Sequence, residues 1–494
     1  MKKYPNSFLI LIALILVSCA LTWLIPAGSY AREAGESGAS ASVGQFSYGE
    51  PTPVSPLALP GYIVDGFAKN MDLILVLLFS GGAFSLVNAS GALQALIHCI
   101  AAKCQKRRLL LLILLTSAFA LICSNQALQL FIPFVPVLVR LTVSMGYDSI
   151  TGAALLILGG GVGFSTGTLR TTTTLIAQKI AGLPLYSGLW FRALCLVIFL
   201  VPTCLFLCLY ARKIEQGPKI SPMYDLDRQL YSDTDRIGKR LSSHADPSGQ
   251  ALSCPLTKKH KRVLAILIVA LALMVYGTLR FSWSVRQLAA VFLVLGIGVG
   301  ILERLPSDEI SGLFLKGSSS LLSAAFLVGF GTSISLILSA GGITDTIIHA
   351  LSQTLSLAPR WSQGACMYLA NTLVNVFITS GTAQASVVMP IFIPVADHLE
   401  MTRQTAVLAY NFGDGFSNYI LPTSSALMGI LGAAKIPFGR WVKFMGKMFL
   451  IWAALSCLLV TIAQAIRLGR ADGLPLMQSP FSVILKKISR LPRL

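Results

Sequence analysis

Long apolar runs recur along this chain of 494 residues, and they constrain its fold more than any other feature. The runs at 189–210 and 444–466 each exceed the roughly 20 residues that an α-helix needs to cross a bilayer. Overall, 54% of the residues are hydrophobic and only 12% are charged, whereas soluble proteins carry about 25% charged residues. The composition therefore excludes a soluble enzyme, a disordered chain and a fibrous protein, and it predicts an all-α polytopic membrane protein.

Basic residues mark the edges of the apolar runs. The net charge is +19, from 39 Lys and Arg against 20 Asp and Glu, which in a soluble protein would suggest a nucleic-acid partner. Here the cations gather after the run at 71–95 and in the polar stretch 212–262, which holds eleven Lys and Arg. Because cytoplasmic loops of membrane proteins carry excess Lys and Arg, we expect both segments to face the cytoplasm and no nucleic acid to bind.

The first 30 residues are compatible with a signal peptide or with a first membrane span. Their apolar run continues past Cys19 through Trp23 and Ile25, which favours an uncleaved span with a cytoplasmic N-terminus. We count about nine spans plus two hairpins that need not cross, in a bacterial inner membrane. The side of the basic C-terminal tail, 467–494, stays open, and the ten scattered cysteines are expected to be apolar fillers.

The two halves of the chain resemble each other in order and spacing. Gln126-Ala127 recurs as Gln384-Ala385, the run at 161–165 recurs at 413–417, and the Thr-rich run at 171–175 recurs at 423–427. The charge pattern makes the first copy enter its hairpin from the cytoplasm and the second from the outside. The sequence thus predicts two inverted repeats, which is the architecture of secondary transporters.

Each half carries two interruptions at membrane depth. The first is a polar hairpin tip, at Ser124-Asn125-Gln126 in one half and at 380–384 in the other. The second is a Gly-rich break inside a later helix, at 159–174 and at 413–425. Irregular backbone at this depth is tolerated only where it is buried in protein or lines a wet cavity. Close helix packing by small residues is the alternative for any single cluster.

Two charged residues lie within these breaks. Arg170 is suited to clamp a carboxylate, although a snorkelling Arg near the interface fits the same position. Asp414 could bind a coupling Na⁺ or H⁺, pair with a cationic substrate group, or form a structural pair. The five histidines form no constellation with acids or cysteines, so we predict no catalytic residue, no metal site and no cofactor beyond the coupling ion.

Several motifs carry a resemblance to a known family. They are NFGDGFSNYILPTSSALM at 411–428, FITSGTAQA at 377–385, GYDSIT at 146–151 and WLIPAG at 23–28. The chain resembles the C4-dicarboxylate anaerobic carrier family, also called the YfcC/DcuC group, within the broad ion transporter superfamily. The resemblance covers about 7–466. It implies a scaffold domain, a mobile transport domain built from re-entrant hairpins and broken helices, and transport of dicarboxylates or amino acids.

The resemblance carries the second-half site over most directly, and the first half departs from it. The family pattern has a Gly-rich, acidic first tip and an Asn-Pro pair in the first break, where this chain has Ser124-Asn125-Gln126 and Thr168-Leu169-Arg170. The missing acids and the added Arg170 disfavour a cationic amino acid and favour an anionic substrate. The Ser-Asn start of the tip also resembles the sodium motif of related symporters.

The expected organisation follows from these observations. The first membrane half is 1–211, with a hairpin at 108–145 and a broken helix at 149–182. A basic cytoplasmic linker at 212–262 leads to the second half at 263–466, with a hairpin at 362–400 and a broken helix at 404–433. The predicted function is secondary transport of a small carboxylate-bearing metabolite by alternating access, cation-coupled or exchanging. A passive anion channel and a membrane-embedded enzyme are the alternatives, and a homodimer through the scaffold stays open.

The candidate residues come from the tips and breaks of both halves. The expected substrate-binding residues are Ser124, Asn125, Gln126, Thr168, Arg170, Thr171, Thr172, Ser380, Gly381, Thr382, Gln384, Asn418, Pro422, Thr423 and Ser424. The expected coupling-ion residues are Ser124, Asn125, Gly161, Gly163, Gly413, Asp414 and Gly415.

Overall fold

A computed structural model describes residues 7–32, 43–103, 107–171, 173–230, 257–281 and 283–469. Thr172, the middle of the predicted basic linker and the predicted tail from residue 470 onward lie outside these ranges. The described chain is almost entirely helical, as expected for an all-α membrane protein.

The helices of the two halves follow one another in a similar order. The first half has α1 (Ser7–Leu24), α2 (Leu59–Lys69), α3 (Met71–Ala89), α4 (Ala92–Lys103), α5 (Arg108–Cys123), η4 (Leu128–Phe134), α6 (Val135–Ser144), α7 (Ser149–Ser165), α8 (Thr174–Ile180) and α9 (Leu189–Gln216). The second half has α12 (Lys258–Phe281), α13 (Val285–Leu302), α14 (Ser307–Ser320), α15 (Leu322–Ala340), α16 (Thr344–Ser356), α17 (Gln363–Phe377), α18 (Gly381–His398), α19 (Arg403–Ser417), α20 (Ser425–Ala433) and α21 (Phe438–Ala465). The short α10 (Tyr224–Leu230) lies between them, in the predicted linker.

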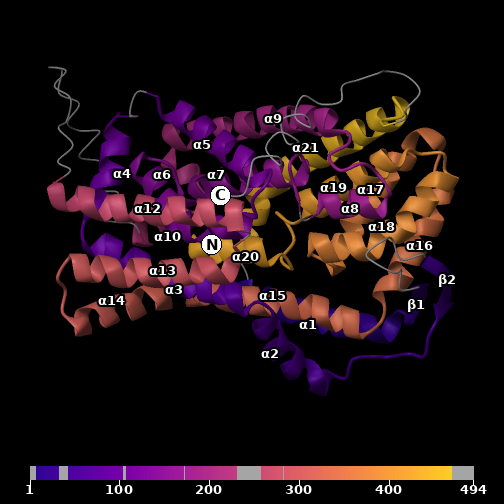
Figure 1. Cartoon of the computed structure of the whole chain (residues 1–494), viewed down its shortest axis with the longest axis horizontal. Coiled ribbons are helices and arrows are strands. Elements are labelled where there is room, and N and C mark those ends of the chain that lie inside the picture. Colours follow the sequence, from indigo (N-terminus) through magenta and orange to yellow (C-terminus); the bar gives the residue numbers. More distant parts are fainter. Residues whose placement is uncertain are drawn as a thin grey trace, which may run out of the picture.

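One small sheet departs from the all-α expectation. Strands β1 (Gly28–Arg32) and β2 (Val43–Tyr48) pair antiparallel within the polar segment after the first helix. Aromatic side chains stabilise this pairing. The Tyr30 and Phe46 rings meet edge to face at 5.2 Å between centroids, and Phe46 stacks on His349 at 4.0 Å. The hairpin thereby packs against α16 at one end of the molecule, as Figure 1 shows.

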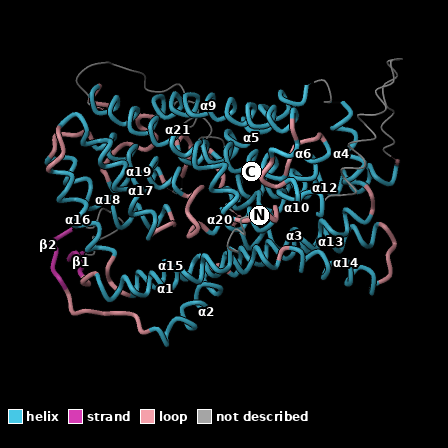
Figure 2. Tube along the Cα trace, turned by 180° about the vertical axis from the view of Figure 1, so that it is seen from behind, coloured by secondary structure: helices cyan, strands magenta, loops and turns pink. Residues whose placement is uncertain are grey.

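Two groups of helices lie on opposite sides of the molecule. In Figures 1 and 2, α13, α14, α15 and α1 run along one side, whereas α9 and α21 run along the other. The first group interlocks the two halves, because α3 packs against α13 and α14 while α15 packs against α1 and α2. Glycines allow one of these contacts: a Cβ at Gly81 would lie 2.5 Å from the carbonyl oxygen of Gly317 on α14.

The two halves match in helix length and packing. α3 and α15 each have 19 residues, and α9 and α21 each have 28. α7 packs against α5, α6 and α9, and α19 packs in the same way against α17, α18 and α21. Helices far apart in the sequence therefore occupy corresponding positions in the two halves.

Five of the described helices are long and apolar enough to cross a bilayer: α3, α9, α13, α15 and α21. Along α9, the side chains of Leu194, Val197, Val201 and Leu205 are between 47% and 63% exposed, as expected for a helix face in contact with lipid. The structure is thus that of a multi-pass membrane protein, while the other crossings of the expected nine stay a prediction.

Candidate functional site

The helix breaks lie later in the chain than the glycine clusters that predicted them. α7 continues through Gly161 and Gly163 to Ser165, and α8 begins only at Thr174. In the second half, α19 continues through Gly413 and Gly415 to Ser417, and α20 begins at Ser425. Regular helix therefore stops at Ser165 and Ser417 and resumes at Thr174 and Ser425, so both interruptions lie within the predicted ranges 159–174 and 413–425 and are shorter than predicted.

Close packing accounts for these helical glycines. A Cβ on Gly163 would clash with the carbonyl oxygen of Ala120 on α5, and one on Gly415 would clash with Ser165 at the end of α7. A Cβ on Gly413 would collide with Asn371 on α17 in the same way. Gly161 and Gly413 lie inside their helices, whereas Gly163 and Gly415 lie in the last turns of α7 and α19. A coupling-ion role for these four glycines stays a prediction that the packing does not require.

The second hairpin tip is held by groups from α19. Helix α18 begins at Gly381, whose carbonyl oxygen accepts a hydrogen bond from the Tyr410 hydroxyl at 2.5 Å. A Cβ on Gly381 would lie 2.5 Å from Oδ2 of Asp414, so only glycine lets this carboxylate approach the start of the helix. An acidic side chain at a helix N-terminus is favourably placed relative to the helix dipole.

Asp414 is fully buried and its carboxylate has a weak set of partners. Its side chain is 1% exposed, and Nδ2 of Asn418 reaches Oδ1 only at 3.5 Å while bonding more closely to the Asp414 backbone carbonyl at 2.7 Å. Nearby, Asn375 donates to the Asp414 carbonyl and to the Ser417 hydroxyl. The side-chain oxygens of Asn375 and Gln384 receive no hydrogen bond within the described ranges.

A polar cavity of about 690 Å³ lies beside the second tip. Its walls come from both tip and break segments and from the opposing helix group. The tips and breaks contribute Phe164, Arg170, Thr173, Ser380, Gly381, Thr382, Asn418, Tyr419 and Ser424. The opposing wall contributes Lys69, Asn70, Thr332, Ser335, Ser339 and Asp345. The cavity thus lies between the second tip with the two breaks on one side and residues of α2, α15 and α16 on the other.

Arg170 joins the first break to the first tip. Its guanidinium donates through Nη1 to the Asn125 carbonyl at 3.1 Å and lies over the Phe164 ring at 4.5 Å from its centroid. Nε has no partner in the described chain, and the residue is 6% exposed while lining the cavity. No carboxylate forms an ion pair with it among the described residues, although the buried Asp414 is near enough to interact with its charge. Arg170 therefore brings positive charge to the cavity wall.

The first tip faces a different environment. Asn125 and Gln126 line a second, largely apolar cavity of about 510 Å³ with residues of η4, α6, α12 and α13, such as Phe131 and Leu271. The Ser124 hydroxyl is satisfied by the Leu121 carbonyl at 2.7 Å. The first tip therefore contributes to the polar cavity only by anchoring Arg170.

The other predicted residues lie near the cavity without lining it. Gln384 is buried and donates to the Asn371 carbonyl at 3.0 Å, and the Thr168 hydroxyl pairs with that of Thr166 at 3.0 Å. Thr423 is buried, and its hydroxyl has no partner among the described residues. Thr171 and Pro422 belong to the breaks but are absent from the lining, which otherwise retains Arg170, Ser380, Gly381, Thr382, Asn418 and Ser424.

The residues of the opposing wall were not predicted from the sequence. A signal for part of it exists, since Thr332, Ser335 and Ser339 follow one another at helical spacings of three and four on α15. Asn70 donates to the Thr332 hydroxyl at 2.5 Å, which ties the end of α2 to that polar face. Lys69 and Asp345 could not be assigned from sequence, because only the packing of distant segments brings them to the cavity.

One family of known proteins matches almost the whole chain. The model of the C4-dicarboxylate anaerobic carrier family matches residues 4–465. The chain belongs to this family. It is therefore a membrane transporter and not an enzyme.

Two curated bacterial proteins are similar over most of the chain. An uncharacterized protein of Haemophilus influenzae is 26% identical over 93% of this chain and 95% of its own length. The putative basic amino acid antiporter YfcC of Escherichia coli is 27% identical over 81% of this chain and 78% of its own length.

Two solved transporter structures are similar at low identity. One is the Alcanivorax borkumensis YdaH transporter, at 16% identity and a TM-score of 0.40 over 94% of this chain and 99% of that one. The other is Neisseria gonorrhoeae MtrF, at 17% identity and a TM-score of 0.41 over 97% and 98%.

Proposed function

We propose that this carrier moves a small carboxylate-bearing metabolite, a C4-dicarboxylate in the first instance, across the bacterial inner membrane by alternating access. The observation that carries the proposal is the polar cavity between the tips and breaks and the face of α15, with Arg170 on one wall and Lys69 on the other. A cavity at the junction of two helix groups opens and closes when one group moves against the other.

The two halves are, in this proposal, inverted repeats with re-entrant hairpins at α5–α6 and α17–α18. The equal lengths of α9 and α21 and the matching packing of α7 and α19 support the repeat. α5 and α17, with 16 and 15 residues, are shorter than the roughly 20 needed to span a bilayer. The scaffold would be the group containing α3 and α15, and the transport domain would contain the tips and breaks.

The charges of the cavity favour an anion as substrate. Two of its three charged lining residues are the cations Lys69 and Arg170, and the third, Asp345, accepts a hydrogen bond from the Tyr30 backbone N–H at 3.3 Å. Two separated cations suit the two carboxylates of a dicarboxylate. An amino acid is the second candidate, because the relative YfcC is described as a putative basic amino acid antiporter.

Asp414 is the proposed centre for the coupling cation, Na⁺ or H⁺. Its buried carboxylate lies close to Gly381 at the start of α18, and the unpartnered oxygens of Asn375 and Gln384 belong to the neighbouring helices α17 and α18. Oxygen ligands of this kind suit a hard cation. We expect Asp414→Asn to abolish gradient-driven accumulation while leaving exchange of substrate for substrate measurable. Loss of neither activity would remove Asp414 from the coupling mechanism.

The distribution of basic residues supports an orientation of the chain in the membrane. We propose a cytoplasmic N-terminus and a cytoplasmic linker, since the stretch 212–262 is rich in Lys and Arg. A homodimer through the scaffold domain stays an open proposal.

Uptake into proteoliposomes tests the function directly. The purified carrier is reconstituted, and entry of labelled succinate and labelled arginine is followed while the Na⁺ and H⁺ gradients are varied separately. We expect saturable succinate uptake that exceeds equilibration when the coupling gradient is imposed. Non-saturating flux down the substrate gradient alone would indicate a channel, and uptake of arginine without succinate would overturn the proposed substrate class.

A further inference from the structure

A buried arginine outside the cavity has no partner that would explain its charge. Arg192, the fourth residue of α9, is 1% exposed. Its Nε, Nη1 and Nη2 atoms all lack a hydrogen-bond acceptor within the described part of the chain. A guanidinium always carries its charge and has five N–H donors. Burying it unpaired is strongly unfavourable, so a group that neutralises it must accompany it.

The position of Arg192 near the N-terminus of α9 adds the positive end of the helix dipole to the charge of the guanidinium. Side chains on a helix lean toward its N-terminus, so the stem of Arg192 is directed toward the first turn of α9. There the cap residue Gly188 offers no side-chain acceptor, and the backbone N–H groups of Trp190 and Phe191 find none within the described ranges. The positive end of a helix dipole repels a cation but attracts an anion.

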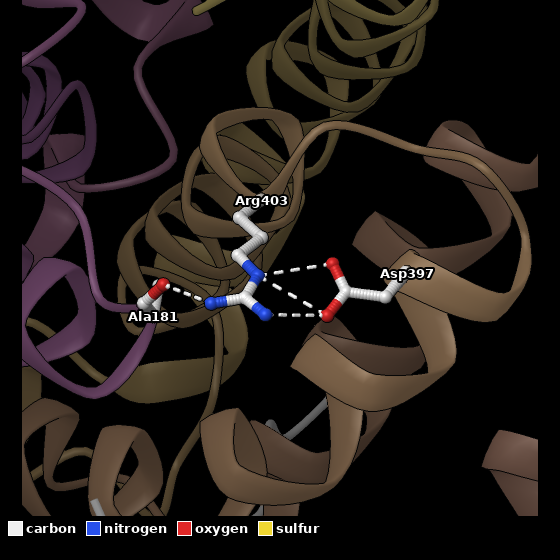
Figure 3. Close-up of polar contacts among 3 residues, drawn as sticks. All are labelled: Ala181, Asp397 and Arg403. Carbon is white, nitrogen blue, oxygen red and sulfur yellow. Dashed lines mark hydrogen bonds and ion pairs between the residues drawn. The ribbon is translucent and has the colours of Figure 1, made fainter.

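A second arginine of the same region, Arg403, has hydrogen-bond acceptors for its guanidinium. Arg403, at the start of α19, holds the Asp397 carboxylate through Nε and Nη2 at 3.0 and 2.7 Å and donates to the Ala181 carbonyl at 3.0 Å, as Figure 3 shows. This pair uses the Asp397 charge at the surface, where both side chains are nearly half exposed. Arg192 has no such carboxylate among the described residues.

Hydrogen bonds beside Gly188 connect the helix that follows the first break to the helix that precedes the second. Gln404 of α19 donates to the Ser187 carbonyl at 2.9 Å, and Gln178 of α8 donates to the same carbonyl at 2.8 Å. A Cβ on Gly188 would lie 2.5 Å from Nε2 of Gln404. A ligand held at the first turn of α9 would therefore brace the elements that follow the first break and precede the second.

We propose that Arg192 and the first turn of α9 bind a small inorganic anion of the size of chloride. One guanidinium calls for a monovalent anion, and the enclosure of all three nitrogens favours a small one. Arg192 does not line the substrate cavity, so this site is separate from the proposed transport site. The bound anion would stabilise the carrier whatever substrate it moves.

Thermal stability of the full-length carrier in detergent tests the site. Sodium chloride or bromide is titrated against sodium gluconate at constant ionic strength, and sulfate is added in a parallel series. We expect a saturable rise of about 2 °C or more in apparent Tm with chloride and bromide, and none with gluconate or sulfate. Equal curves for all salts would overturn the proposal.

Matched variants separate the site from general effects of charge. Arg192→Gln should lose the chloride-dependent rise, and Arg192→Lys should keep part of it because the charge remains. Arg403→Gln removes an equal charge from the same region and should keep the full rise, even at a lower Tm. If Arg192→Gln does not fold, anomalous scattering from bromide-soaked wild-type crystals decides: a peak beside Arg192 supports the site, and its absence there contradicts it.

Discussion

The two hairpin tips come from corresponding places in the two halves but meet different surroundings. The second tip, at Ser380, Gly381 and Thr382, opens onto the polar cavity. In the first tip, the Ser124 hydroxyl donates to the Leu121 carbonyl, and Asn125 and Gln126 line an apolar cavity. Corresponding positions in the two halves thus do not share the same chemical surroundings.

The difference assigns unequal tasks to the two halves. The second half supplies hydroxyls, a glycine-dependent helix start and the buried Asp414. The first half supplies two cations, Lys69 at the end of α2 and Arg170 in the first break, and its tip anchors Arg170 through a backbone carbonyl. Because a backbone carbonyl does not depend on the side chain of Asn125, substitutions in the two tips should have unequal effects.

The largest effect is expected for Arg170, the cation that the first break contributes to the cavity. Arg170→Gln removes charge-assisted hydrogen bonds to a carboxylate, which are worth about 1.5–3 kcal/mol, so initial succinate uptake should fall about 10- to 100-fold. Arg360→Gln is the control, since its side chain is 82% exposed in a surface pair with Glu400. Succinate uptake within twofold of wild type in Arg170→Gln would remove the clamp from the account.

Gly381 should be the most sensitive neutral position of the second tip. In Gly381→Ala the new methyl group would press on Oδ2 of Asp414 at 2.5 Å and on Cγ2 of Thr173 at 2.8 Å. Overpacking of this kind costs about 1–3 kcal/mol, and we expect roughly a tenfold loss of uptake in folded protein. Gly446→Ala on α21, where a Cβ meets nothing within 4 Å, should behave as wild type. Equal activity of the two variants would show that the tip shifts to accommodate the added methyl group beside Asp414, and that glycine is not required at position 381.

The smallest effects should still rank the two tips. Thr382→Ala removes a hydroxyl from the cavity wall and should raise the KM for succinate about three- to fivefold, as expected for one neutral hydrogen bond. Asn125→Ala leaves the carbonyl that anchors Arg170 and should change KM less than twofold. KM values from initial rates over a range of succinate concentrations provide the comparison, and the reverse order would mean that substrate contacts the first tip.

The sequence located the interruptions because polar and small residues inside apolar runs are conspicuous. The predicted breaks begin too early, at 159 and 413, because glycines such as Gly163 and Gly415 serve helix packing and the chain leaves the helix only after them. Their predicted ends, at 174 and 425, coincide with the starts of α8 and α20. Asp148, within the motif at 146–151, caps the start of α7, because its carboxylate accepts a hydrogen bond from the Thr151 backbone N–H at 2.9 Å.

The rest depended on tertiary contacts that one sequence does not encode locally. Lys69 reaches the cavity only because α2 packs on α15 from the other half. Arg192 was overlooked within an apolar run that reads as a plain span, because its lack of partners shows only in the folded chain. The β1–β2 hairpin likewise forms through contacts with His349, more than 300 residues away.

A structure of the carrier with bound succinate, by cryo-electron microscopy, tests the central claim most directly. The account predicts density in the polar cavity, with one carboxylate within hydrogen-bonding distance of Arg170 and the molecule in contact with the tip at Ser380–Thr382. Succinate density beside Asn125 and Gln126 in the apolar cavity, with the polar cavity empty, would contradict it.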